Sequence, residues 1–123
     1  MQKRKFVYLS MVLLAVFCFS SCEYDVIEVK QIVIPPDQEM SFSNDILPIF
    51  TSNCVDCHNG TTSPDLRSEN AYNSLLSGDY LDTTDPENSD LYQKLQSDSH
   101  GARASSEEKQ WILEWIKRGA KDN

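Results

Sequence analysis

Beyond residue 40, hydrophobic side chains recur at intervals of three and four residues, which is the period of one face of an α-helix. The clearest case is the segment 105–119. Ser105 and Glu108 have the spacing of a capping box at its start, a basic pair suits the negative end of the helix dipole, and Gly119 marks its end. Its predicted buried stripe is Trp111, Ile112, Trp115 and Ile116.

Three shorter helices are predicted before this one. The first begins near residues 44–45, because Pro48 is tolerated only in the first turn of a helix. The second covers residues 68–77 and stops at Gly78, and the third lies within residues 86–97. No segment has a credible partner for a β-sheet, so the sequence predicts an all-α domain.

Residues 1–21 have the form of a secretory signal peptide. A basic start precedes an apolar run over residues 6–19, which is shorter than the ~20 residues that span a bilayer, although a membrane-spanning anchor remains the alternative. Two serines then precede Cys22. This arrangement resembles a bacterial lipoprotein signal, which implies that Cys22 becomes the new N-terminus and is lipidated with palmitate-like acyl chains. Several chains give durable membrane attachment, where a single chain is marginal.

The lipoprotein resemblance implies a place in the bacterial cell envelope. We expect an anchor in a membrane, preferably the outer membrane, with the folded part in the periplasm or at the cell surface. Residues 22–40 are rich in β-branched side chains and are stopped by Pro35 and Pro36, which predicts a semi-extended linker. Residues 41–123 then form the folded domain.

Charge narrows the possible partners. The chain of 123 residues carries a net charge of −8, and removing residues 1–21 leaves 8 cations against 19 acids, or −11. That balance excludes binding to the phosphate backbone of nucleic acid. The acidic run within residues 79–90 is interpreted as a solvated loop that would at most steer a basic partner.

About 80 residues with four short helices bury little apolar area, so the predicted domain needs a supplement to its core. Cys54, Cys57 and His58 form a Cys-x-x-Cys-His motif, the attachment signature of a c-type haem. Two thiols at this spacing reach the two vinyl groups on one edge of the macrocycle, and the adjacent histidine reaches the iron. The alternatives are a redox Cys-x-x-Cys pair, a zinc site that includes His100, and a plain disulfide.

The motif lies in a longer stretch, 42–58, that resembles small class I-like cytochrome c domains of bacterial envelope proteins. The segments 88–95 and 115–120, with Asn-Ser-x-Leu-Tyr and Trp-Ile-x-x-Gly-Ala patterns, extend the resemblance over the folded part. The resemblance implies one covalent haem c and a first helix that ends at the motif and packs across the last helix. It also implies that His58 is the proximal iron ligand.

The second axial ligand is where the chain departs from that family. Many relatives have a methionine shortly before the last helix, whereas this chain has His100 in the matching polar stretch. His100 is therefore the candidate distal ligand. The alternatives are a solvated His100 with ligation by Met40, by a lysine or tyrosine, or an open site.

Two function classes follow. The first is a non-catalytic electron carrier, a membrane-anchored monohaem cytochrome that moves single electrons between envelope donor and acceptor proteins. The second is a haem enzyme or ligand sensor with an open distal iron site. A third and weaker class is a non-haem binding module whose two thiols are merely oxidised.

Overall fold

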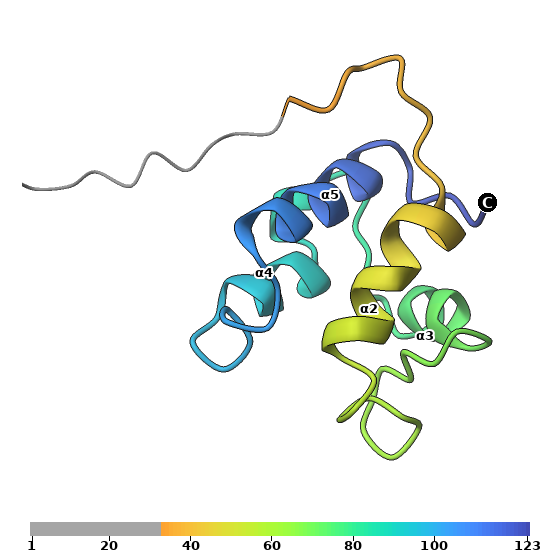
Figure 1. Ribbon diagram of the computed structural model, residues 1–123, viewed down its shortest axis with the longest axis vertical. Coiled ribbons are helices and arrows are strands. Elements are labelled where there is room, and N and C mark those ends of the chain that lie inside the picture. The colour runs from red at the N-terminus through yellow and green to blue at the C-terminus, as the bar shows by residue number, and fades with distance from the viewer. Residues whose placement is uncertain (1–32) are drawn as a thin grey trace, which may run out of the picture.

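The computed structural model describes residues 33–123. The predicted signal peptide, the lipidation at Cys22 and the first part of the predicted linker lie outside the described residues. The helical elements, in chain order, are η1 (Phe42–Ile46), α2 (Leu47–Asn53), α3 (Ala71–Ser77), η2 (Pro86–Asn88), α4 (Asp90–Gln96) and α5 (Ser106–Lys117) (Figure 1). Residues 33–123 contain no strand, so the all-α prediction is confirmed for this part of the chain.

The first predicted helix exists but is built in two parts. Ser41 caps the π-helical turn η1, because its side-chain oxygen accepts from the Asn44 amide and its own amide donates to Asp45 at 2.7 Å. The α-helix proper begins at Leu47, with Pro48 in its first turn as predicted. Proline fits there because the missing N–H has no acceptor within the helix.

The two middle helices are shorter than predicted. α3 begins at Ala71 rather than at residue 68, and Leu76 of its predicted apolar face is 55% exposed. The predicted third helix is interrupted at Ser89, whose backbone is extended with ψ of 141°, so it divides into η2 and α4. The Ser89 hydroxyl is buried and donates to the Pro86 carbonyl at 2.8 Å, which stabilises this break.

Helix α5 follows the sequence prediction closely. The capping box is confirmed: the Glu108 amide donates to the Ser105 hydroxyl at 3.2 Å, and the Ser105 amide donates to the Glu108 carboxylate at 2.7 Å. Gly119 follows the helix with φ of +94°, a conformation that costs glycine little and other residues more. Local sequence signals therefore set both ends of this helix.

The core joins the first and last helical segments. Phe42 of η1 lies 5.3 Å from Trp115 of α5 between ring centroids, and Tyr72 of α3 meets the edge of Phe42 at the same distance. The first helical segment therefore contacts the last through η1, whereas packing of α2, the helix that ends at the motif, across α5 stays a prediction. The buried apolar residues are Met40, Phe42, Ile46, Ile49, Phe50, Leu66, Ala71, Leu75, Leu91, Leu95, Ala104, Ile112, Trp115, Ile116 and Ala120.

The end of the predicted linker is packed onto the domain. Met40 is only 5% exposed and belongs to the core, and Arg118, the residue after α5, donates to the carbonyls of Gln38 and Pro35. The side chain of Asn123 donates to the Met40 carbonyl at 3.1 Å. The predicted linker, residues 22–40, therefore extends too far. Met40 is buried in the core, so the packed domain begins before residue 41.

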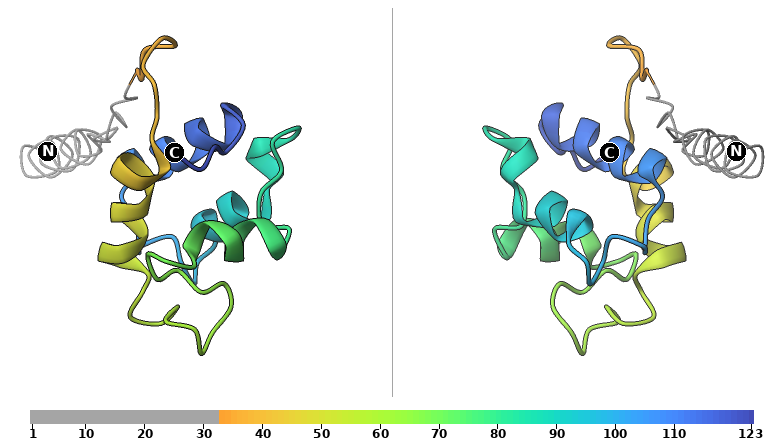
Figure 2. Two further views of the ribbon diagram at one scale, coloured as in Figure 1. Left: turned by 90° about the vertical axis from the view of Figure 1, so that its right-hand side faces the viewer. Right: turned by 90° about the vertical axis from the view of Figure 1, so that its left-hand side faces the viewer.

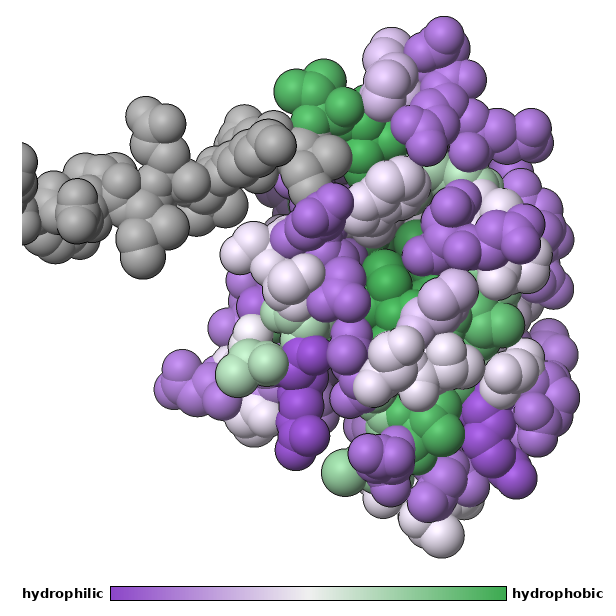
Figure 3. All heavy atoms as spheres, viewed as in Figure 1, coloured by the Kyte–Doolittle hydropathy of each residue, from purple (hydrophilic) through white to green (hydrophobic). Residues whose placement is uncertain are grey.

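The linker and the loop that follows α2 leave the domain at opposite ends. Figure 2 shows the orange segment before η1 at one end and the yellow-green loop after α2 at the other. Polar side chains cover most of the face in Figure 3, and apolar ones come to the surface near its middle. None of the helices within residues 33–123 has the length and apolar character of a bilayer-crossing segment.

Candidate functional site

The Cys-x-x-Cys-His motif forms the turn that ends α2. Cys54 is the residue after the helix, and its carbonyl accepts the amides of Cys57 at 3.2 Å and of His58 at 3.0 Å. The Cys54 side chain is half-buried and that of Cys57 is exposed, and both are free thiols. This turn brings the two thiols and the His58 ring to one end of α2.

The ring of His58 is held by the loop that follows it. Its Nδ1 lies 3.0 Å from the Pro64 carbonyl, and the His58 carbonyl accepts the Leu66 amide at 2.8 Å. A carbonyl can only accept, so Nδ1 carries the proton and Nε2 is left as the free lone pair. Metal-binding histidines are oriented in this way by a partner on the other ring nitrogen.

The loop that carries Pro64 is fixed to α3. The Asp65 amide donates to the Ser74 hydroxyl at 2.8 Å, and the Asp65 carboxylate pairs with Arg67 at 2.6 Å and accepts from Asn70 at 2.8 Å. Hydrogen bonding from Arg67 holds the pKa of the Asp65 carboxyl well below its usual range. These bonds keep the Pro64 carbonyl in place beneath His58.

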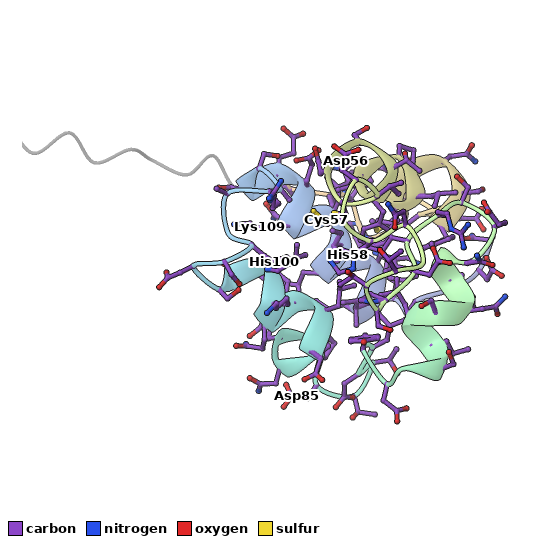
Figure 4. The ribbon with its side chains drawn as sticks, turned by 90° about the horizontal axis from the view of Figure 1, so that it is seen from below. Asp56, Cys57, His58, Asp85, His100 and Lys109 are labelled. Atoms are coloured by element: carbon purple, nitrogen blue, oxygen red, sulfur yellow. The ribbon has the colours of Figure 1, made fainter. Side chains whose placement is uncertain are left out.

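His100 faces His58 from the loop between α4 and α5. The two imidazole rings have centroids 6.1 Å apart and planes inclined by 54° (Figure 4). The Nδ1 of His100 lies 2.9 Å from the Ser99 hydroxyl, which can donate or accept, so Nε2 of His100 is a lone pair only in the tautomer whose Nδ1 donates to Ser99. Two residues that are 42 positions apart in the sequence thus lie next to each other.

A cavity of about 810 Å³ lies at these two histidines. Known ligand sites have volumes of about 300–1,000 Å³, so this one accepts a cofactor-sized molecule. Cys54, Cys57, His58 and His100 all line it, so the structure brings together the four residues that the sequence singled out. Its apolar lining comes from Phe50, Pro64, Leu66, Tyr80, Leu91 and Leu95.

Sequence reasoning did not identify the cations of this site. Lys94 of α4 and Arg103 of the loop before α5 line the cavity, together with the acids Asp56 and Asp90. Although the chain has a net charge of −8, Lys94 and Arg103 could pair with carboxylate groups of a bound cofactor. No motif marks either cation, because their meeting depends on how α4 and the loop pack.

The site passes a simple test of fit for an iron porphyrin. Imidazole nitrogens bind transition metals at about 2.0–2.1 Å, so two axial histidines on one metal have nitrogens about 4 Å apart and ring centroids about 6 Å apart. The separation of His58 and His100, 6.1 Å, is in that range. The mainly apolar lining of the cavity suits a macrocycle, and both thiols lie on its wall.

Electrostatics at the site favour neutral side chains. Burial lowers the pKa of His100, and the nearby charges of Lys94, His58 and Arg103 lower it further. Imidazole binds a metal in its neutral form, so this shift suits a ligand. Burial raises the pKa of the Cys54 thiol, with Glu108 adding to the effect and Arg103 opposing it. A catalytic thiol–disulfide motif needs the reverse, a thiol with a lowered pKa.

Two alternatives find no support in this geometry. Within residues 33–123, no three His, Cys, Asp or Glu side chains are grouped as a metal ion would require, which disfavours the zinc site. Met40, an alternative distal ligand, is buried in the core and does not line the cavity.

The acidic run over residues 79–90 is used mostly to close its own loop. The Asp82 carboxylate accepts from the Thr84 hydroxyl at 2.7 Å and from the amides of Thr84 and Asp85, and these bonds lower its pKa. Glu87 pairs with Lys117 at 3.0 Å on the surface. This arrangement is that of a solvated loop, as the sequence suggested.

The comparisons with known proteins add no family to this description. No protein-family model, no curated protein and no solved structure matches the chain. The site is therefore interpreted from its own residues.

Proposed function

We propose that the chain is a membrane-anchored monohaem c-type cytochrome that carries single electrons between redox proteins of the bacterial cell envelope. The observation that carries the proposal is the pair His58 and His100, which face each other at 6.1 Å across a cavity whose wall holds both motif thiols. The cytochrome c-like character of the all-α domain is part of the proposal. When bound, the haem supplies reversible one-electron chemistry at its iron.

Each group of the site has a defined task. The thiols of Cys54 and Cys57 would each add S–H across one vinyl double bond, so sulfur and hydrogen would end on the two carbons and no oxidant would be needed. His58 would hold the iron through Nε2, because the Pro64 carbonyl holds its Nδ1. His100 would be the second ligand, and an imidazole there would give a lower reduction potential than a methionine.

The second candidate function is a haem enzyme or a ligand sensor with an open distal position. It is favoured by the place of His100 on a polar loop, with Ser99 beside it exposed. Binding of His100 to iron and an open iron site exclude each other. The state of the distal position therefore decides between the two functions.

Mass spectrometry tests the covalent attachment. The full-length chain is exported in a bacterial host with a c-type maturation system, and the intact protein should gain the mass of one haem. The variant Cys54→Ala or Cys57→Ala should lose one thioether, whereas Cys22→Ser, which removes a thiol outside the motif, should keep both. Wild-type protein without bound tetrapyrrole would overturn the proposal.

Absorption and electron paramagnetic resonance spectra test the axial ligands. The wild-type ferric protein should be low-spin and should not bind carbon monoxide on reduction. His100→Ala should turn the ferric haem high-spin and open it to carbon monoxide. A low-spin spectrum that His100→Ala leaves unchanged would show that another group is the ligand, and a high-spin wild type would favour the enzyme or sensor.

Membrane fractionation tests the proposed anchor. Cys22→Ser should release the protein from membranes into the soluble fraction, because Cys22 is the residue that would carry the acyl chains. Cys57→Ala serves as the control that changes a thiol without touching the anchor. Equal membrane association of Cys22→Ser and wild type would contradict lipidation at this residue.

A further inference from the structure

The loop of residues 97–105, called here the distal loop, holds itself together at its α4 end. The Ser97 hydroxyl donates to the Lys94 carbonyl at 2.7 Å. The Ser97 carbonyl then accepts the amides of His100 at 3.1 Å and Gly101 at 2.6 Å. A Cβ at Gly101 would lie 2.9 Å from that same carbonyl, so the turn around His100 is a tight unit with its own internal hydrogen bonds.

Lys109 ties this unit to α5. Its ammonium donates to the carbonyl of Gly101, the residue after His100, at 2.6 Å, and the bond is partly buried (Figure 4). Hydrogen bonds from a charged donor are shorter and stronger than neutral ones. The bond therefore fixes the part of the distal loop from which the His100 ring extends.

The position of Lys109 on its helix argues for a role outside the helix. α5 begins at Ser106, so Lys109 lies in the first turn, where the positive end of the helix dipole disfavours a cation. Glu107 and Glu108 are the residues that suit this turn. The hydrogen bond from the Lys109 ammonium to the Gly101 carbonyl of the distal loop offsets this unfavourable placement.

The same turn of α5 is also connected to the opposite wall of the cavity. The Glu108 carboxylate accepts from the side chain of Asn53 at 3.0 Å, and Asn53 immediately precedes Cys54 at the end of α2. Neighbouring residues of α5 thus hold the wall with the thiols and the wall with His100. This turn sets the distance between the two walls.

We propose that Lys109 is a positioning residue for the distal iron ligand: by holding the Gly101 carbonyl it keeps His100 opposite His58. The inference rests on the proposed function and adds a residue to it. Loss of the ammonium frees the distal loop from α5, and the His100–iron bond then has to hold the loop by itself.

Carbon monoxide binding to the reduced full-length holoprotein tests this role. Lys109→Met keeps most of the apolar stem and removes the donor, and it should raise the carbon-monoxide-accessible fraction by about tenfold, as expected for one charge-assisted hydrogen bond. Lys109→Arg, which keeps a cationic donor, should restore binding close to the wild-type level. Lys121→Met is the matched control, because its side chain is exposed and lies away from the distal loop.

The outcomes separate the inference from the proposed function. Absence of haem from the wild type would overturn both the proposed function and the role of Lys109. An unchanged spectrum in His100→Ala would show that His100 is not the ligand, so Lys109 would have no ligand to position. If His100→Ala opens the iron while Lys109→Met binds carbon monoxide no better than Lys121→Met, the proposed function stands and the inference is overturned. Equal thermal unfolding of Lys109→Met and Lys109→Arg, together with different carbon monoxide binding, supports positioning over general destabilisation.

Discussion

Single hydrogen bonds decide what the two histidines can do. The Pro64 carbonyl occupies Nδ1 of His58 at 3.0 Å, and the Ser99 hydroxyl occupies Nδ1 of His100 at 2.9 Å. The carbonyl only accepts, so His58 carries its proton on Nδ1 and has Nε2 as its lone pair, whereas the hydroxyl can donate or accept and gives His100 the same lone pair in one of its two tautomers. A sequence identifies a histidine as a candidate ligand, but the nitrogen it offers depends on a neighbour that folding brings to the ring.

At the residue scale, Gly78 has a steric role beside the cavity. A Cβ on this residue would lie 2.3 Å from the ring of Tyr80, which lines the cavity. Gly78→Ala should therefore displace Tyr80 and lower the free energy of unfolding by about 1–3 kcal/mol, as overpacking does. Thermal unfolding measures this loss. Ser77→Ala, an exposed change one residue earlier, is the control, and equal stability of the two variants would contradict the clash.

At the scale of elements, α5 combines a local role with two long-range ones. Its capping box is complete within residues 105–108, so its start depends on local bonds. Its apolar face then buries Ile112, Trp115 and Ile116 against η1 and the rest of the core. Its first turn also reaches both walls of the cavity, through Glu108 and Lys109.

The start of α5 gives a stability prediction. Ser105→Ala removes the side-chain acceptor for the Glu108 amide and should lower the free energy of unfolding by about 1 kcal/mol. Urea unfolding measures the change. Ser106→Ala, the next and exposed residue, should have little effect, and a loss of the same size there would show that the cap is not responsible.

Glu108 gives a pH prediction for the same turn. Burial raises the pKa of Glu108, but hydrogen bonds from the Ser105 amide and the Asn53 side chain outweigh it, so the net pKa is lowered. A lowered folded-state pKa means that the stabilisation is complete above the unfolded value of about 4.3 and is lost as pH falls through the folded one. Wild-type stability should therefore fall more steeply than that of Glu108→Gln as the pH is lowered below about 5.

Glu108→Gln is an informative variant because glutamine can also complete a capping box. It removes the titration and keeps an acceptor for the Ser105 amide, but its single side-chain oxygen cannot also accept from Asn53 as the carboxylate does. Glu108→Ala, which removes both acceptors, should be less stable than wild type at neutral pH. Parallel pH profiles for wild type and Glu108→Gln in urea unfolding would contradict the prediction.

At the scale of the whole molecule, the site and the linker are separated. The linker reaches η1 beside Arg118 and Asn123, while the thiols and His58 follow the far end of α2. Figures 1 and 2 show these two ends on opposite sides of the domain. Residues 33–40 and the motif thiols are therefore at opposite ends of the described domain.

This arrangement predicts that tethering does not hinder electron transfer. The holoprotein bound to vesicles through Cys22 and the soluble Cys22→Ser protein should reduce a soluble redox protein at the same rate within about twofold, because residues 33–40 and the motif thiols lie at opposite ends of the domain (Figure 2). Stopped-flow absorbance measures both rates. A membrane-bound rate that is lower by tenfold or more would indicate that the cavity faces the lipid surface.

The sequence by itself determined much of the local structure. The α-helical class, the position of Pro48 in a first turn and the capping box of Ser105 and Glu108 follow from side chains that act on their own neighbours. The spacing of Cys54, Cys57 and His58 likewise placed one wall of the site, because a single helical end fixes all three.

Only the tertiary structure decided the rest. The burial of Met40 and the cations Lys94 and Arg103 at the cavity depend on segments that are far apart in the chain. The same holds for the 6.1 Å between His58 and His100. Hydrogen bonds and apolar contacts between distant residues set these features, and no local pattern encodes the distance across a cavity.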